Sequence, residues 1–221
     1  MSIGEIIRSK GITRVLHFTT TRGLLGILAT WAVKSRHRLP EEKYLEFIYQ
    51  PNCEIRRDPD WLDYVNLSIE RINEIFFDIC ANRWHTDREW CVLSFAPDIL
   101  AHEGVAFATT NNSYPGVERG RGVSGLMALY ATRMGQCHRW GNSYERPPGL
   151  APNLPTCPQA EVLYPGELSL DSLNRVFLSA DEQTDDVAGQ IAALGCRQID
   201  FEVDISVFRY RNRSGVVVWN G

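Results

Sequence analysis

Short apolar runs typical of strands alternate irregularly with segments of helical periodicity, and this order limits the architectures open to the chain. Apolar residues recur at helical spacing over about 20–28 and 72–79, and Pro40 with two following acids predicts a helix start for 40–49. The expected strands are 13–19, 64–69, 90–95, 105–109, 160–164, 175–178 and 199–203. Because strands and helices do not alternate regularly, the pattern favours an α+β fold.

Nucleotide-binding folds of the most familiar kinds are disfavoured. No G-x-G-x-x-G or G-x-x-x-x-G-K motif follows an expected strand, so neither a Rossmann fold nor a P-loop fold is predicted. No internal repeat or segment of low complexity occurs either. A mixed α+β domain of irregular topology therefore remains.

Length and charge further limit the number of domains and the kinds of ligand to be expected. A chain of 221 residues with 44% hydrophobic residues is long enough for one sizeable core, so we expect a single domain over residues 1–221. The formal net charge is −4 and the pI is about 5.8. A protein that coats duplex nucleic acid makes many phosphate contacts and is usually basic, so bulk binding to a duplex is not expected.

The cysteines and the apolar segments argue against a metal site and a membrane span. No pair of cysteines has C-x-x-C spacing, so we expect no metal and reduced thiols at positions 53, 80, 91, 137, 157 and 196. No stretch reaches the apolar length needed to cross a bilayer, and residues 1–10 lack a signal-peptide pattern. The expected location is the cytoplasm.

His17 lies at the end of an apolar run, just before an expected helix. His17 and Thr19 share one side of a strand, and the free amides of the helix start that follows suit an anion or a polar ligand. The alternative is an ordinary histidine of the core or surface with no ligand. Both interpretations remain open from the residues alone.

Glu161 opens an apolar strand directly after a long stretch, 132–158, that is rich in Gly, Pro, Asn and Arg. Loops of that length inside a compact domain are usually functional or disordered. If Glu161 is partly buried, its carboxylate can bind a ribose hydroxyl and stabilise positive charge at an anomeric carbon. The alternative is an acid at a strand edge, exposed to water.

Other charged residues are less informative. Arg56 and Arg57 suit a clamp on a pyrophosphate, or they form a solvated loop. A glycosidase would need a second carboxylate, and nothing in the placement of Asp63 or Glu167 selects either.

Three segments together resemble a known family. The His17-Phe18-Thr19 opening, the Asp63-Tyr64-Val65 segment after basic residues, and the Gln159-Ala160-Glu161-Val162-Leu163 strand are similar, in order and spacing, to DarT. DarT is a DNA ADP-ribosyltransferase toxin of toxin–antitoxin systems, and the resemblance spans nearly the whole chain. It implies an ADP-ribosyltransferase fold with flanking helices and a split, mixed central β-sheet.

The resemblance also implies the roles of the site residues. NAD would be the co-substrate, bound by His17, Phe18, Thr19 and Tyr64. Glu161 would be catalytic, assisted by Arg56 or Arg57.

The same resemblance implies the acceptor, a base of single-stranded DNA presented by the 132–158 loop. The substrate-binding residues expected there are Arg139, Trp140, Tyr144 and Arg146. The run Asn66-Leu67-Ser68-Ile69 departs from thymine-modifying members and is more similar to the guanine-modifying branch. An antitoxin that reverses or blocks the modification would be the partner. An acceptor of RNA or protein, or a module that binds NAD or nucleic acid without catalysis, remains the alternative.

Overall fold

The computed structural model describes residues 1–39, 58–135, 143–195, 197 and 199–208. The α-helices are α1 (Ile3–Lys10), α2 (Thr21–Thr30), α3 (Glu74–Ile79), α4 (Gly122–Ala128) and α5 (Gln183–Leu194). The strands are β1 (Val15–Thr20), β2 (Ala32–Lys34), β3 (Tyr64–Ile69), β4 (Trp90–Phe95), β5 (Ala106–Ala108), β6 (Arg119–Arg121), β7 (Arg133–Met134), β8 (Tyr144–Glu145), β9 (Glu161–Pro165), β10 (Glu167–Ser169), β11 (Leu173–Leu178) and β12 (Phe201–Val203).

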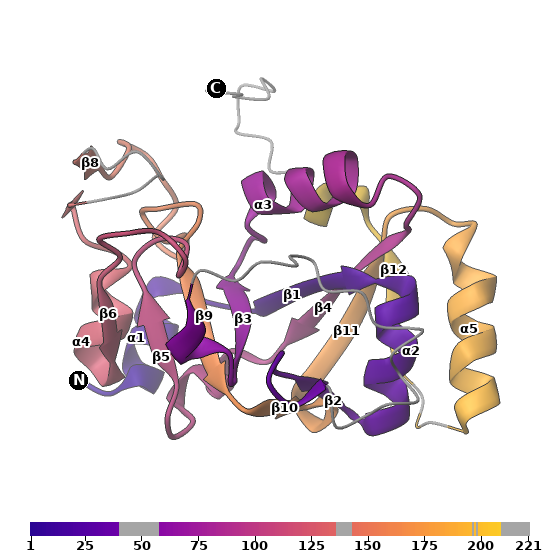
Figure 1. Ribbon diagram of the computed structural model, residues 1–221. Helices are drawn as coiled ribbons and strands as arrows, with labels where there is room; N and C mark the ends of the chain where they lie inside the picture. The colour runs from indigo at the N-terminus through magenta and orange to yellow at the C-terminus, as the bar shows by residue number, and fades with distance from the viewer. Residues whose placement is uncertain (40–57, 136–142, 196, 198, 209–221) are drawn as a thin grey trace.

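A large mixed sheet forms the centre of the molecule (Figure 1). Within the described residues it has eight strands in the order β12-β11-β4-β1-β3-β9-β5-β6. Only β11 and β12 pair in parallel among these neighbours; the other pairs are antiparallel. Strands distant in sequence thus lie side by side, and the predicted α+β fold with a mixed central sheet is confirmed.

Apolar residues cover both faces of the sheet. In β4, Leu93 belongs to the larger core, which also receives Leu24 of α2 and Val187 of α5. Its neighbour Val92 belongs to a smaller core on the other face, under α3. Because successive strand residues point to opposite faces, all six residues of β4 are buried.

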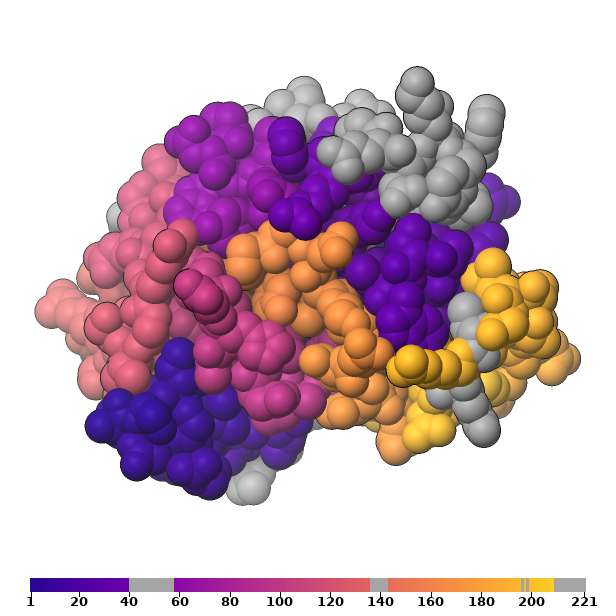
Figure 2. Space-filling view, turned by 90° about the horizontal axis from the view of Figure 1, so that it is seen from below, coloured from indigo at the N-terminus to yellow at the C-terminus, as the bar shows by residue number. Residues whose placement is uncertain are grey.

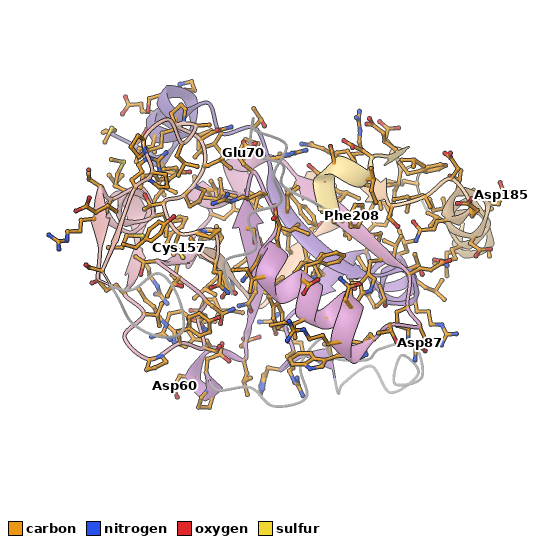
Figure 3. All side chains as sticks on the ribbon, turned by 90° about the horizontal axis from the view of Figure 1, so that it is seen from above. Asp60, Glu70, Asp87, Cys157, Asp185 and Phe208 are labelled. Carbon is orange, nitrogen blue, oxygen red and sulfur yellow. The ribbon has the colours of Figure 1, made fainter. Side chains whose placement is uncertain are left out.

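The helices lie around this sheet in distinct places. From below, the indigo N-terminal segment and the yellow C-terminal segment occupy opposite edges of the molecule (Figure 2). From above, α3 crosses in front of the sheet, close to the labelled Phe208 (Figure 3). The ring of Phe208 lies 5.8 Å from that of Phe77 in α3. The small core is therefore aromatic.

The sheet is split between β1 and β3. These strands pair only at Val15–Ile69 and Leu16–Ser68. By contrast, β1 pairs with β4 along all six residues, and β3 pairs with β9 from Tyr64 to Leu67. Beyond Leu16 the two strands therefore separate, each held by its outer neighbour, and the predicted split sheet is present.

The expected elements agree well with those observed. Strands 64–69 and 90–95 have the predicted bounds, and the other predicted strands differ from the observed ones by a few residues at their ends. The helix expected at 40–49 lies outside the described residues. The helices α1, α4 and α5 were not anticipated.

A close backbone contact joins α4 to the edge of the sheet. A Cβ built on Gly125 would lie 2.5 Å from the carbonyl oxygen of Gly120 in β6. We expect Gly125→Ala to separate helix and strand and to lower the free energy of unfolding by about 1–3 kcal/mol. Gly189→Ala is the control, because nothing lies within 4 Å of a Cβ at this exposed position in α5. It should stabilise the helix by about 0.5–1 kcal/mol. Urea denaturation of both variants checks this, and an unchanged Gly125→Ala protein would contradict it.

Candidate active site

Glu161 is the first residue of β9, between β3 and β5, and it pairs with Ala108. Its side chain is only 6% exposed. Burying a carboxylate is costly unless hydrogen bonds replace the lost water. The alternative of an exposed strand-edge acid is therefore wrong, and the interactions around Glu161 become informative.

N–H groups of Asn66, Asn111 and Asn112 hold the Glu161 carboxylate. Its Oε2 accepts from the side-chain amide of Asn66 at 2.8 Å and from the backbone N–H of Asn112 at 3.0 Å. Its Oε1 accepts from the side-chain amide of Asn111 at 3.1 Å. Such bonds stabilise the ionised form and set its orientation.

The Asn112 donor is itself held in place by its surroundings. The Asn112 amide donates to Asp58 at 2.5 Å, and its Oδ1 and backbone carbonyl accept from Arg119 at 2.6 and 2.7 Å. The Arg119 guanidinium also lies 5.2 Å from the centre of the Trp61 ring. With Asn112 only 1% exposed, this network fixes one of the donors to Glu161.

His17 lies where β1 and β3 separate. Its Nδ1 is 3.0 Å from the backbone carbonyl oxygen of Asn66. A carbonyl only accepts, so Nδ1 carries a proton. Burial lowers the pKa of His17, and the bond to the Asn66 carbonyl opposes this effect without overcoming it. The ring is therefore neutral near pH 7, with Nε2 as an acceptor.

Phe18 and Thr19, which were also expected to bind NAD, make different contacts from His17. Phe18 points into the small aromatic core, with ring centres 5.3 Å from Phe77 and 5.8 Å from Trp90. The Thr19 hydroxyl lies over the first turn of α2, because a Cβ on Gly23 would come within 2.4 Å of it.

Tyr64 contacts Arg121 and Trp61. Its hydroxyl accepts from Arg121 at 2.8 Å, and its ring lies 4.8 Å from that of Trp61. The structure thus joins His17 to Glu161 through Asn66, while Phe18, Thr19 and Tyr64 make other contacts. Their roles in NAD binding remain predictions.

The expected substrate-binding residues and the arginines expected to assist Glu161 are only partly described. Arg56, Arg57, Arg139 and Trp140 lie outside the described residues. Tyr144 packs against the larger core. Arg146 donates to the carbonyls of Leu154 and Ala151 at 2.9 and 2.7 Å, so it links separate parts of the 132–158 stretch. Substrate binding by either residue remains a prediction.

Asn66, Asn111 and Asn112 were not singled out as site residues from the sequence. Asn66 carried a signal, since it is a polar residue between the apolar residues Val65 and Leu67 of β3, and Asn111-Asn112 closely follows β5. Neither signal identifies Glu161 as the hydrogen-bond partner, because Asn66 and Asn111 lie 95 and 50 positions before Glu161 in the sequence.

Metal and membrane features are not found in the described part of the chain. No group of three or more His, Cys, Asp or Glu residues there is placed to hold a metal ion. No helix within the described ranges has the length and apolarity needed to cross a membrane. Of the six cysteines, the three that are described, Cys80, Cys91 and Cys157, are buried.

Comparison with known proteins decides the family. A family model described as "ssDNA thymidine ADP-ribosyltransferase, DarT" matches residues 16–209, which is most of the chain. The chain belongs to the DarT family. It is thus an ADP-ribosyltransferase, as the resemblance implied. Comparison with curated protein sequences found no significant match.

Solved DarT structures share the fold. Thermus sp. 2.9 DarT in complex with carba-NAD+ has a TM-score of 0.61 and 14% identity, covering 88% of this chain and 97% of the other. The same protein in complex with ADP-ribosylated ssDNA has a TM-score of 0.60 and 13% identity, covering 89% and 96%. Thermosipho africanus DarTG in complex with ADP-ribose has a TM-score of 0.57 and 11% identity, covering 91% and 52%.

The partly buried, neutral His17 predicts acid sensitivity. Its pKa is lowered from 6.5 in the folded chain, so the unfolded chain binds the proton first as pH falls. The free energy of unfolding should therefore decrease below about pH 6.5, by at most about 1.4 kcal/mol per pH unit from this group. In His17→Gln this contribution should vanish, whereas His102→Gln, at an exposed position, should keep it. Urea denaturation at pH 7.5 and 5.5 checks this, and equal pH dependence in His17→Gln and wild type would contradict it.

Proposed function

We propose that this DarT-family chain transfers ADP-ribose from NAD to a base of single-stranded DNA, with release of nicotinamide. The observation that carries the proposal is the buried Glu161 carboxylate, held by N–H donors beside the split in the sheet. The binding of NAD+ and of ADP-ribosylated ssDNA by Thermus sp. 2.9 DarT supports both substrates.

The chemistry needs a fixed negative charge. The bond between C1′ of the nicotinamide ribose and the ring nitrogen breaks, and its electron pair leaves with neutral nicotinamide. Positive charge then develops at C1′ and the ring oxygen, where Glu161 stabilises it and accepts a hydrogen bond from a ribose hydroxyl. A nitrogen of the acceptor base forms the new bond to C1′ and loses a proton to solvent. Holding NAD in one orientation supplies the rest of the acceleration.

His17 would take part in NAD binding. Its neutral ring presents Nε2 as an acceptor, which suits a ribose hydroxyl or an amide N–H. Thr19, on the same side of β1, lies over the first turn of α2, where backbone amides favour a phosphate. Phe18 and Tyr64 would complete the NAD contacts.

Arg56 and Arg57 are proposed to assist Glu161 and to hold the pyrophosphate. The support comes from sequence position: the next residue, Asp58, accepts a hydrogen bond from Asn112, whose N–H donates to Glu161. An arginine fork suits pyrophosphate better than a lysine does.

The acceptor base is proposed to be guanine. The support is the run Asn66-Leu67-Ser68-Ile69, which departs from thymine-modifying members, whereas the matching family description names thymidine. The 132–158 loop would present the base through Arg139, Trp140, Tyr144 and Arg146. An antitoxin that reverses or blocks the modification, a cytoplasmic location and a single domain over 1–221 complete the proposal.

Glu161→Gln tests the mechanism. The substitution removes the charge and keeps the shape, so we expect transfer to fall at least about a hundredfold while NAD still binds. Glu103→Gln, at an exposed position, is the matched control and should keep wild-type turnover. Nicotinamide release and NAD titration calorimetry give the two readouts. Turnover near the wild-type rate in Glu161→Gln would refute the mechanism. Absence of any release by the wild type would favour a module that binds without catalysis.

The acceptor is tested with one oligonucleotide, single-stranded and annealed, in which guanine and thymine are replaced in turn. We expect modification of the single strand that disappears when guanine is replaced, because stacked and paired bases are inaccessible in a duplex. If two or three phosphates are contacted, the log–log salt slope should be about −1.4 to −2. Mass spectrometry of the products gives the result. Loss on replacing thymine instead would overturn the base assignment, and labelling of RNA or protein alone would overturn the DNA acceptor.

A further inference from the structure

Asn66 contacts both candidate functional residues, one with its backbone and one with its side chain. Its carbonyl oxygen accepts from Nδ1 of His17 at 3.0 Å, and its side-chain amide donates to Oε2 of Glu161 at 2.8 Å. The two residues lie on β1 and β9, which are the two neighbours of β3 in the sheet. We propose that Asn66 is a positioning residue that fixes the NAD-binding histidine and the catalytic carboxylate relative to one another.

The backbone pairing makes Asn66 a rigid link. Asn66 pairs with Leu163 of β9, two residues after Glu161. Side chains two residues apart on a strand share a face, so the Asn66 amide points to the side on which the Glu161 carboxylate lies. β3 pairs with β1 at Ile69 and Ser68, and this pairing stops two residues short of Asn66. The Asn66 carbonyl is therefore available to His17.

A side chain at this position must donate a hydrogen bond. Asn66 lies between two apolar neighbours, Val65 and Leu67, that are 3% and 1% exposed, and its own amide donates to the Glu161 carboxylate. An aspartate has the same shape but donates only when protonated, and when ionised it repels the carboxylate of Glu161. Asparagine satisfies both shape and charge.

The proposal extends the proposed function, since it assumes that Glu161 acts on NAD. It predicts that Asn66→Ala lowers kcat for nicotinamide release roughly 10- to 100-fold, the scale of one hydrogen bond to a charged group. The KM for NAD should change less than about threefold. His17→Ala should instead raise KM.

Asn66→Asp supplies a readout that a merely structural role would not change. Its activity should fall as pH rises and recover toward pH 5, where the two carboxylates share a proton. Asn174→Asp is the matched control, because it adds the same charge at an exposed position on β11, and its pH profile should follow that of the wild type.

The experiment measures nicotinamide release from NAD by these variants between pH 5 and 8.5, with thermal unfolding recorded for each. A pH profile of Asn66→Asp parallel to that of the wild type would overturn the proposal. If Asn66→Asp does not fold, the kcat of Asn66→Ala decides, and a wild-type kcat would overturn it. Absence of release by the wild type would refute the proposed function instead, so the two failures are distinguishable.

Discussion

The candidate site depends on the place where β1 and β3 stop pairing. The two strands share only two residue pairs, and beyond Leu16 each is held by a different neighbour. A backbone carbonyl released from a sheet needs another donor. His17 supplies this donor to Asn66, so the gap in the ladder orients the histidine, while burial lowers its pKa and keeps the ring neutral. The apolar cores on both faces of β4 hold the sheet rigid around this gap.

The second constraint is the buried charge of Glu161. A carboxylate that is 6% exposed would destabilise the fold without partners, and its partners include N–H donors of Asn66, Asn111 and Asn112. Asn112 is itself held by Asp58 and Arg119. Because these groups are already fixed, the network needs little reorganisation when positive charge develops nearby. Electrostatic stabilisation of an oxocarbenium-like state requires this property. The same rigidity explains why we expect substitutions here to affect rate more than folding.

Local pattern predicted most of the sheet and missed several helices. The bounds of β3 and β4 were predicted because apolar and aromatic residues typical of strands predominate in both segments. In α5, Val187, Ile191 and Leu194 recur at helical spacing, so a signal was present. In α4 the signal is weaker, because Gly122 and Gly125 lower the helix propensity of a short segment. The close contact of Gly125 with Gly120 of β6 is visible only in the tertiary structure.

The sequence by itself determined the α+β class, the strand that carries Glu161 and the strand that carries His17, because these follow from hydrophobic periodicity and residue type. It also placed both residues next to segments suited to a ligand. Only the tertiary structure decided that Glu161 is buried and that Asn66, Asn111 and Asn112 hold it. The reason is physical: these bonds join residues from about 50 to 95 positions apart, and strand order and register bring them within 3.1 Å. Periodicity along one strand contains no information about which strand lies beside it.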